Sequence, residues 1–274
     1  MYTLKSNVLE CEFNTSEGCL YAAKINNLLS GSAFVPDGSG SEFEIKFTDG
    51  STISSKSLPI SEYAEKNGTL YFRFKEEQHT TATMRYKVGK DGNTIEKQLV
   101  LTQSEPKTID CIYLENIGII NSSSSYTVPG GETEIEKYYS NLGQPFYIDS
   151  LFFGCEFPAT KNGIFHGRGQ VIYYLGKPVE DEKLVCPTVV IGGAESHLMV
   201  DLKKAFFKYI SGISLKAPYY LMYNTWYDRM LNIDADCITE DFYKIEKQLT
   251  GHGIPPIDGY AVSYTHLRAH ETGR

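Results

Sequence analysis

The stretch TTATMRYKVGKDGNTIEKQLVLT, residues 80–102, decides the fold class of this 274-residue chain. Two runs in which apolar and polar side chains alternate flank the tetrapeptide KDGN at 90–93, a sequence typical of a tight turn. This alternation has the period of a β-strand, because successive side chains of a strand point to opposite faces of a sheet. The stretch therefore predicts an antiparallel hairpin with one buried face.

The same pattern extends from this hairpin in both directions along the chain. Short alternating or apolar runs include EFEIKF (42–47), TLYFRFK (69–75) and IDCIYLENI (109–117), and similar runs continue from 142 to 200 with Gly and Pro between them. Helical periodicity is almost absent from this part. Strands at such a spacing predict a large antiparallel β-sandwich.

The pattern changes near residue 201. In DLKKAFFKYIS (201–211) the apolar residues fall on one helical face, with Asp201 as the expected N-cap and Gly212 as the expected end. A nearly continuous apolar strand is then expected over 217–226, a helix over 238–249 with Gly251 as its C-cap, and a strand over 257–262. This order is a βαβ unit. Its first strand is expected to be buried on both faces, as in a parallel sheet.

Composition and charge narrow the function classes. The net charge is -8 and Lys and Arg do not cluster, which argues against a nucleic-acid partner. Neither a membrane-spanning run nor a signal peptide is recognisable, so we expect a soluble, cytoplasmic protein without a membrane partner. The 6 cysteines lie far apart without a CxxC motif, which predicts free thiols rather than a zinc site or a disulfide framework.

Two blocks carry a family resemblance: GQPFYIDSLFFGCEFPATKN (143–162) and APYYLMYNTWYDRMLNIDADCITEDFYKIEKQL (217–249). They resemble clan D glycoside hydrolases, in particular bacterial family 36 α-galactosidases and α-N-acetylgalactosaminidases. The segment NTWY, which contains Trp226, matches the end of the first barrel strand in that family. The resemblance implies an N-terminal β-supersandwich followed by a (β/α)8 catalytic barrel.

The resemblance also implies a retaining hydrolysis of terminal α-linked galactosides by two Asp residues. In the family both lie on later barrel strands, so no catalytic residue is assigned in this chain. An Asp pair that binds sugar hydroxyls would follow the second barrel strand, where residues 263–274 begin. These last residues resemble a translated sequencing adapter, and we expect them to be a foreign, structureless tail. The chain is thus expected to be truncated and inactive by itself.

Two residues are candidates for substrate binding. Trp226 is expected at the carboxyl end of the first barrel strand, where such barrels build their active sites, and its ring can stack on a galactose ring or pack in the core. Asp228 can accept hydrogen bonds from sugar hydroxyls or simply hydrate the loop. Asp258 is expected to be structural.

Metal and cofactor sites are not expected. The segment 232–236 (NIDAD) imitates the start of an EF-hand loop, but Cys237 and Tyr243 stand where Gly and Glu are required. Helix capping explains its carboxylates better. The sequence contains no Walker P-loop and no G-x-S-x-G elbow, and no dinucleotide-binding fingerprint with all three of its glycines.

The sequence therefore predicts a mainly β chain: a β-supersandwich over 1–200, a linking helix over 201–216, the first βαβ unit of a truncated (β/α)8 barrel over 217–262, and the foreign tail over 263–274. The predicted function is that of the N-terminal fragment of a retaining, α-galactosidase-like glycosidase with an oligosaccharide or glycoside substrate. The alternative is a non-catalytic carbohydrate-binding β-sandwich. The sequence leaves open a homo-oligomer of the full-length protein and the choice between galactose and N-acetylgalactosamine.

Overall fold

The chain divides into two compact units, Met1–Ile213 and Ser214–Arg274, in a computed structural model of the protein. The structure describes residues 1–16, 18–127, 143–216, 218–230 and 232–262.

The first unit is built from β-strands. Its strands are β1 (Tyr2–Lys5), β2 (Leu9–Ser16), β3 (Cys19–Asn27), β4 (Ser32–Phe34), β5 (Glu44–Phe47), β6 (Thr52–Ser54), β7 (Ile60–Lys66), β8 (Thr69–Phe74), β9 (Thr80–Val88), β10 (Ile95–Gln103), β11 (Ile109–Gly118), β12 (Ser125–Thr127), β13 (Phe146–Ile148), β14 (Leu151–Cys155), β15 (Lys161–Phe165), β16 (Arg168–Lys177), β17 (Leu184–Val185) and β18 (Val189–Gly193).

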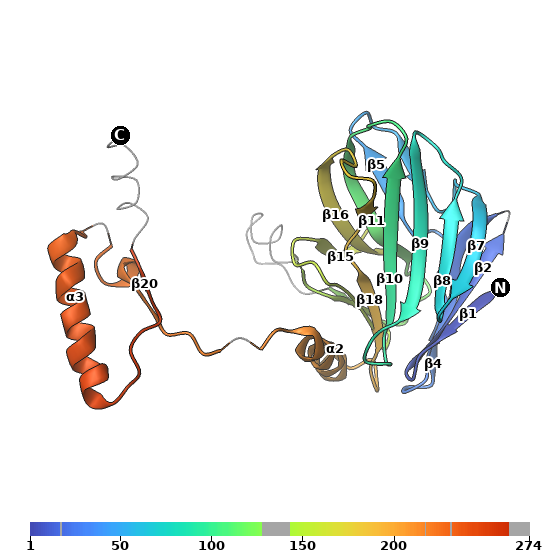
Figure 1. Ribbon diagram of the computed structural model, residues 1–274. Coiled ribbons are helices and arrows are strands. Elements are labelled where there is room, and N and C mark those ends of the chain that lie inside the picture. Colours follow the sequence, from blue (N-terminus) through green and yellow to red (C-terminus); the bar gives the residue numbers. More distant parts are fainter. Residues whose placement is uncertain (17, 128–142, 217, 231, 263–274) are drawn as a thin grey trace. The chain divides into compact units, whose positions relative to one another are not determined.

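Within the described residues these strands form three antiparallel sheets. The largest has the order β12-β13-β14-β18-β10-β9-β8-β7, with β17 also paired to β10, and Figure 1 shows β8, β9 and β10 side by side. The second has the order β15-β16-β11-β5-β6, and the third β1-β2-β3-β4. One apolar core contains residues from all three, such as Leu9, Ile45 and Phe72. The predicted mainly β fold is confirmed.

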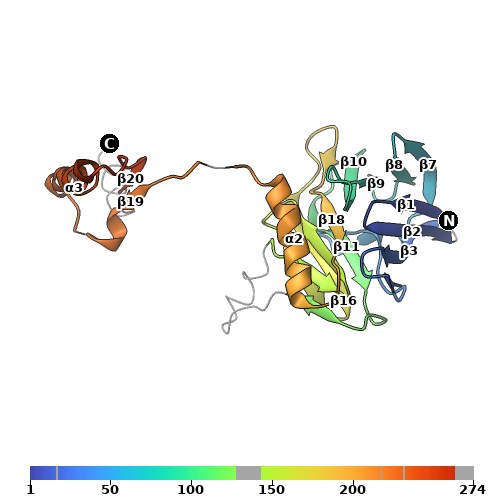
Figure 2. The same ribbon diagram turned by 90° about the horizontal axis from the view of Figure 1, so that it is seen from below.

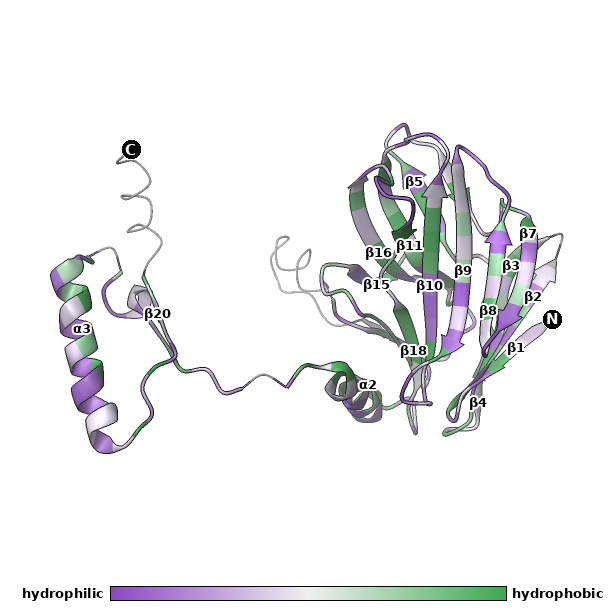
Figure 3. Cartoon of the chain, in the orientation of Figure 1, coloured by the Kyte–Doolittle hydropathy of each residue, from purple (hydrophilic) through white to green (hydrophobic). Residues whose placement is uncertain are grey.

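The hairpin that decided the fold class is present. Strands β9 and β10 pair in register from Val88↔Ile95 to Thr80↔Gln103. Burial alternates along β9, where Ala82, Met84 and Tyr86 face the core, and Figure 3 shows hydrophobic and hydrophilic residues following one another along β8 and β10. The alternation in the sequence is therefore the alternation between core and outer face.

A buried ionic cluster connects the three sheets. Lys97 on β10 is 1% exposed, and its Nζ lies 3.0 Å from a carboxylate oxygen of Glu42 and 3.0 Å from one of Glu115 on β11. The hydroxyl of Tyr86 on β9 donates to Glu42, and Glu42 also accepts a bond from the backbone N–H of Ala22 on β3 at 2.6 Å. One ammonium group thus serves two carboxylates away from water.

The charge imbalance in this cluster perturbs its titration. Burial, opposed in part by the Lys97 ammonium, raises the pKa of Glu115 to about 7, and the Glu42 carboxylate adds to the rise. Burial alone would lower the pKa of Lys97, but the two carboxylates hold it above its ordinary value. The cluster therefore takes up a proton on Glu115 more readily than an exposed glutamate does.

Helix α2 (Met199–Ile213) covers part of the largest sheet and belongs to the first unit (Figure 2). Its predicted apolar face is confirmed, because Leu202, Phe206 and Tyr209 pack in a second core cluster that includes Phe152 of β14. The ring centroids of Phe152 and Phe206 are 5.5 Å apart in an edge-to-face arrangement.

The predicted ends of this helix are wrong. The helix begins at Met199, so Asp201 lies inside its first turn rather than at the N-cap, and it continues past Gly212 to Ile213. The hydroxyl of Ser196 makes the preceding turn: it accepts a bond from the backbone N–H of Leu198 at 3.1 Å and donates to the Asp201 carboxylate at 2.6 Å.

The second unit has the predicted βαβ order. Its elements are β19 (Met222–Asn224), the 3-10 helix η1 (Thr225–Tyr227), helix α3 (Ala235–Gln248), the 3-10 helix η2 (Thr250–His252) and β20 (Gly259–Ala261). Strands β19 and β20 are parallel, with Tyr223 paired to Tyr260. A single βαβ unit is what the structure describes, and a closed barrel stays a proposal.

Two details of this unit differ from expectation. The first strand is much shorter than 217–226 and is not buried on both faces, since Tyr219 is 85% and Met222 53% exposed. Two short strands and one helix offer no second layer to cover the other face. The left-handed residue after the helix is Gly253, with φ of 81°, rather than Gly251, because η2 adds a further turn.

The prediction of a foreign tail at 263–274 lies outside the described residues. Among the helices of the described part, none is both long and apolar enough to cross a membrane.

The buried cluster predicts a pH-dependent stability. Folding raises the pKa of Glu115 from 4.5 to about 7. The contribution of Glu115 to the free energy of unfolding, on the order of 3 kcal/mol, is therefore fully present below pH 4.5 and is lost as the pH rises through 7. Glu115→Gln should remove this part of the dependence of the unfolding free energy on pH. Chemical denaturation between pH 4.5 and 8 measures it.

Glu105→Gln is the control, since this side chain is 71% exposed. It should keep the wild-type slope of unfolding free energy against pH. An unchanged slope in Glu115→Gln would show that Glu115 is ionised throughout this range.

Candidate functional site

The residues that follow β19 form a capped turn. Asn224 ends the strand, and its side-chain oxygen accepts a hydrogen bond from the backbone N–H of Trp226 at 2.9 Å. The buried Thr225 carbonyl accepts bonds from the backbone N–H groups of Asp228, Arg229 and Met230. This turn fixes the backbone of the NTWY segment at the carboxyl end of the strand.

Both predicted site residues lie on this turn. Trp226 is 49% exposed in the second unit. The Asp228 side chain is 61% exposed, and one of its oxygens accepts a bond from the Tyr223 hydroxyl at 2.7 Å. The structure thus brings the indole ring and the carboxylate onto one turn. Their role in binding sugar stays a prediction.

A polar network that the sequence analysis did not predict supports this turn. We call Tyr223, Asp228, Arg229, Asp241 and Tyr260 the Asp241 network. Asp241 on α3 is 3% exposed and accepts bonds from the Arg229 guanidinium at 2.6 Å, the Tyr260 hydroxyl at 3.1 Å and the Tyr223 hydroxyl at 3.4 Å. The network therefore joins both strands, the turn and the helix.

The electrostatics of the network suit a fixed scaffold. Hydrogen bonds from Arg229 hold the pKa of Asp241 below its usual range. Burial and the bond to Asp241 raise the pKa of Tyr260 to about 12, and burial with the bond to Asp228 raises that of Tyr223. At neutral pH the phenols are donors and Asp241 is an acceptor, so the network orients groups rather than transferring protons.

Aromatic rings complete the packing between strand and helix. The rings of Tyr223 and Tyr260 lie 5.2 Å apart, and that of Phe242 on α3 lies 4.7 Å from Tyr260. The sequence contained a signal that Asp241 is buried. It stands three residues after Ile238 and four before Ile245, within the predicted apolar stripe of the helix, where a carboxylate needs a buried partner.

The carboxylates that imitate an EF-hand serve the helix instead. Asp234 is the N-cap of α3, and its side chain accepts a bond from the backbone N–H of Cys237 at 2.8 Å. Helix capping is therefore confirmed. Among the described residues no group of three or more His, Cys, Asp or Glu side chains is arranged to hold a metal ion. Asp258 is structural as predicted, because its carboxylate accepts a bond from the backbone N–H of Leu221 at 2.7 Å.

Comparison with known proteins rests on structure. No family model matches the chain, and no curated protein matches it. Among solved structures, the GH36 α-galactosidase AgaA from Geobacillus stearothermophilus in complex with raffinose is 11% identical, with a TM-score of 0.52 over 90% of this chain. The N-terminal part of the chain has a GH36-like fold.

Two further structures agree. The galactosidase domain of the α-galactosidase-sucrose kinase AgaSK is 11% identical, with a TM-score of 0.54 over 94% of this chain and 49% of its own. The α-N-acetylgalactosaminidase NagBb from Bifidobacterium bifidum, in complex with GalNAc, is 10% identical, with a TM-score of 0.54 over 77% of this chain and 39% of its own. The chain spans 48% of the length of AgaA, about half.

The Asp241 network predicts an asymmetric response to two neighbouring substitutions. Asp241→Asn removes the buried charge that pairs with Arg229, so amide hydrogen exchange in α3 and β20 should quicken by about tenfold or more. Exchange followed by mass spectrometry measures it.

Glu240→Gln is the matched control. Glu240 also contacts Arg229, at 3.1 Å, but its side chain is 53% exposed. Its substitution should leave exchange within about twofold of wild type. Equal effects of the two variants would show that the buried pair does not hold the unit together.

Proposed function

We propose that this chain is the N-terminal part of a retaining α-glycosidase that hydrolyses terminal α-linked galactosides. The observation that carries the proposal is a GH36-like fold over most of the chain, ending in a βαβ unit with Trp226 at the carboxyl end of β19. The carboxyl ends of strands are where (β/α)8 barrels build their active sites.

The exposed apolar surface of the second unit supports a continuing barrel. Besides Trp226, the large apolar side chains there that stay exposed are Leu215, Tyr219, Tyr220, Met222, Tyr227, Met230, Phe242, Tyr243 and Ile254. Further βα units would cover this surface. The alternative function, a non-catalytic sugar-binding sandwich, gives no reason for a βαβ unit with such faces.

The two candidate residues and their polar neighbours have proposed parts. Trp226 would stack on the apolar C–H face of the terminal sugar, and Asp228 would accept bonds from its hydroxyls. Tyr223 and Arg229 would hold Asp228 in place. The two carboxyl groups that retaining hydrolysis needs, about 5 to 5.5 Å apart, would come from later strands of the complete protein.

Cytoplasmic localisation is part of this proposal. All six cysteines are free thiols, and unpaired cysteines are usual in a reducing compartment.

The proposal predicts a difference between this chain and the complete reading frame. The 274-residue chain should not hydrolyse an aryl α-galactoside above a mock preparation, because glycosidase rate enhancements require both carboxylates. The complete protein should hydrolyse it, and an aryl α-glucoside serves as the specificity control. Turnover by this chain that a substitution within it abolishes would place the active site here instead.

Trp226→Ala in the complete protein should impair function more than folding. Loss of a stacking partner costs about 1–3 kcal/mol of binding, by analogy with bases on aromatic side chains, which corresponds to about 5- to 150-fold in kcat/KM. Melting temperature and kcat/KM are measured on the same variant.

A core role for Trp226 would give the opposite pattern. The variant would then lose about 3–5 kcal/mol of stability, while any folded protein kept the wild-type kcat/KM. That result would exclude Trp226 from the sugar site.

A further inference from the structure

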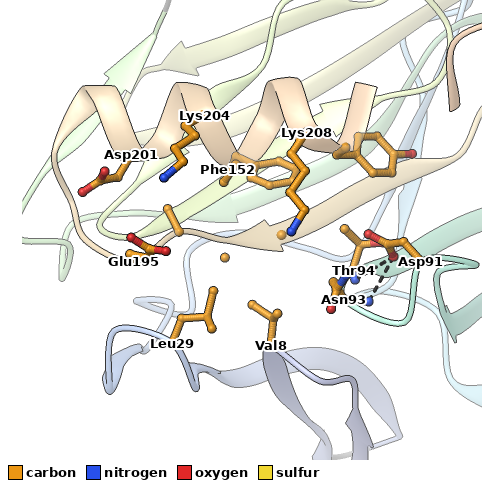
Figure 4. A pocket seen from close by; sticks show the side chains of 15 residues that line it. Val8, Leu29, Asp91, Asn93, Thr94, Phe152, Glu195, Asp201, Lys204 and Lys208 are labelled. Carbon is orange, nitrogen blue, oxygen red and sulfur yellow. Dashed lines mark hydrogen bonds between the residues drawn. The ribbon is translucent and has the colours of Figure 1, made fainter. Parts of the chain in front are cut away.

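A cleft of about 290 Å³ lies in the first unit, where several segments distant in the sequence meet (Figure 4). Helix α2 forms one wall. The end of β18, the turn between β9 and β10, and the residues around Val8 and Leu29 form the rest. The residues of the βαβ unit have no part in it.

The floor of the cleft is apolar and depends on two glycines. A Cβ at Gly192 would lie 2.1 Å from the Phe152 ring, and one at Gly193 would lie 2.8 Å from a methyl group of Val8. Only glycine lets β18 approach both side chains. Phe152 and Val8 are themselves buried, at 2% and 8% exposed, so the open apolar surface of the cleft is that of Leu29, which is 51% exposed.

Hydrogen-bond donors come from α2. Lys204 and Lys208 are four residues apart and therefore on one face of the helix, and Figure 4 shows their ammonium groups reaching toward the cleft. Within the described part of the chain neither ammonium group forms an ion pair. Their donors are available to a ligand.

Hydrogen-bond acceptors line the same cleft. Glu195 and Asp201 lie beside Lys204, and Asp91 lies on the side of Lys208 (Figure 4). One oxygen of Asp91 is used by the turn, where it accepts bonds from the backbone N–H groups of Asn93 and Thr94. Two ammonium groups thus stand among three carboxylates around an apolar floor.

This arrangement selects a class of ligand. Interspersed donors and acceptors match groups that both donate and accept, as hydroxyls do, and the excess of one carboxylate disfavours an anion. The volume is near the lower end of ligand pockets, at about 300 Å³. We propose that the cleft binds a neutral saccharide at a site of its own on the sandwich. The proposal does not depend on the proposed catalytic function.

Titration calorimetry of the 274-residue chain with D-galactose, raffinose and D-galacturonate tests it. Trp226→Ala is the background in every titration, so that sugar held by that ring does not contribute. We expect saturable binding of galactose or raffinose with a Kd on the order of 1 mM, and binding of galacturonate at least threefold weaker. Galactose as the better ligand would indicate a site for a single ring, and raffinose one for a longer chain.

Substitutions around the cleft locate the binding. Lys204→Ala with Lys208→Ala should weaken the preferred sugar at least tenfold, and Glu195→Gln, which does not alter the helix, should weaken it at least threefold. Lys203→Ala is the matched control, because Lys203 is exposed on α2 and does not line the cleft.

Three results would overturn the proposal. They are the absence of saturable binding of either neutral sugar, tighter binding of galacturonate than of galactose, and an equal loss in Lys203→Ala. Circular dichroism of each variant confirms that α2 is retained.

Discussion

One ammonium group links the three sheets of the sandwich. Lys97 of the largest sheet lies between Glu42 and Glu115, and through them it reaches both other sheets, since Glu115 is on β11 and Glu42 binds the backbone of β3. A buried charge is tolerated only where its partners are fixed. The three sheets must therefore keep one relative position for this cluster to exist, whereas apolar contacts alone would tolerate small shifts. The imbalance of charge in the cluster links that position to pH.

The face covered by α2 shows how close packing creates a polar cleft. The helix needs Phe152 beneath it, and Phe152 needs Gly192 beside it. The helix that buries Leu202 and Phe206 necessarily presents Lys204 and Lys208 elsewhere on its surface. Packing of one apolar stripe thus places two ammonium groups at the mouth of the cleft, without any local sequence motif for a binding site.

A buried charged group with fixed polar partners also occurs in the second unit. Asp241 is its one buried carboxylate among the described residues, and it gathers Arg229 and two tyrosines from both strands. This network can hold a turn such as that of Trp226, yet it leaves most of the apolar surface uncovered. A unit that is ordered by polar bonds and still exposes large apolar side chains suits the beginning of a larger domain.

Much of the local structure follows directly from the order of the amino acids. Alternation in β8 and β9, the hairpin at 90–93, the βαβ order, the capping by Asp234 and the position of Trp226 after a strand all follow from periodicity and turn chemistry, which act within a few residues. The position of β10 between β9 and β18 depends on packing between segments that are distant in the chain, and so does the burial of Lys97, Glu115 and Asp241. Charged residues are expected at the surface unless a partner is present, and these partners stand up to 55 positions away, as Glu42 does from Lys97. The cleft has the same origin, because Asp91, Gly192 and Lys208 meet only when the sheets and the helix have packed.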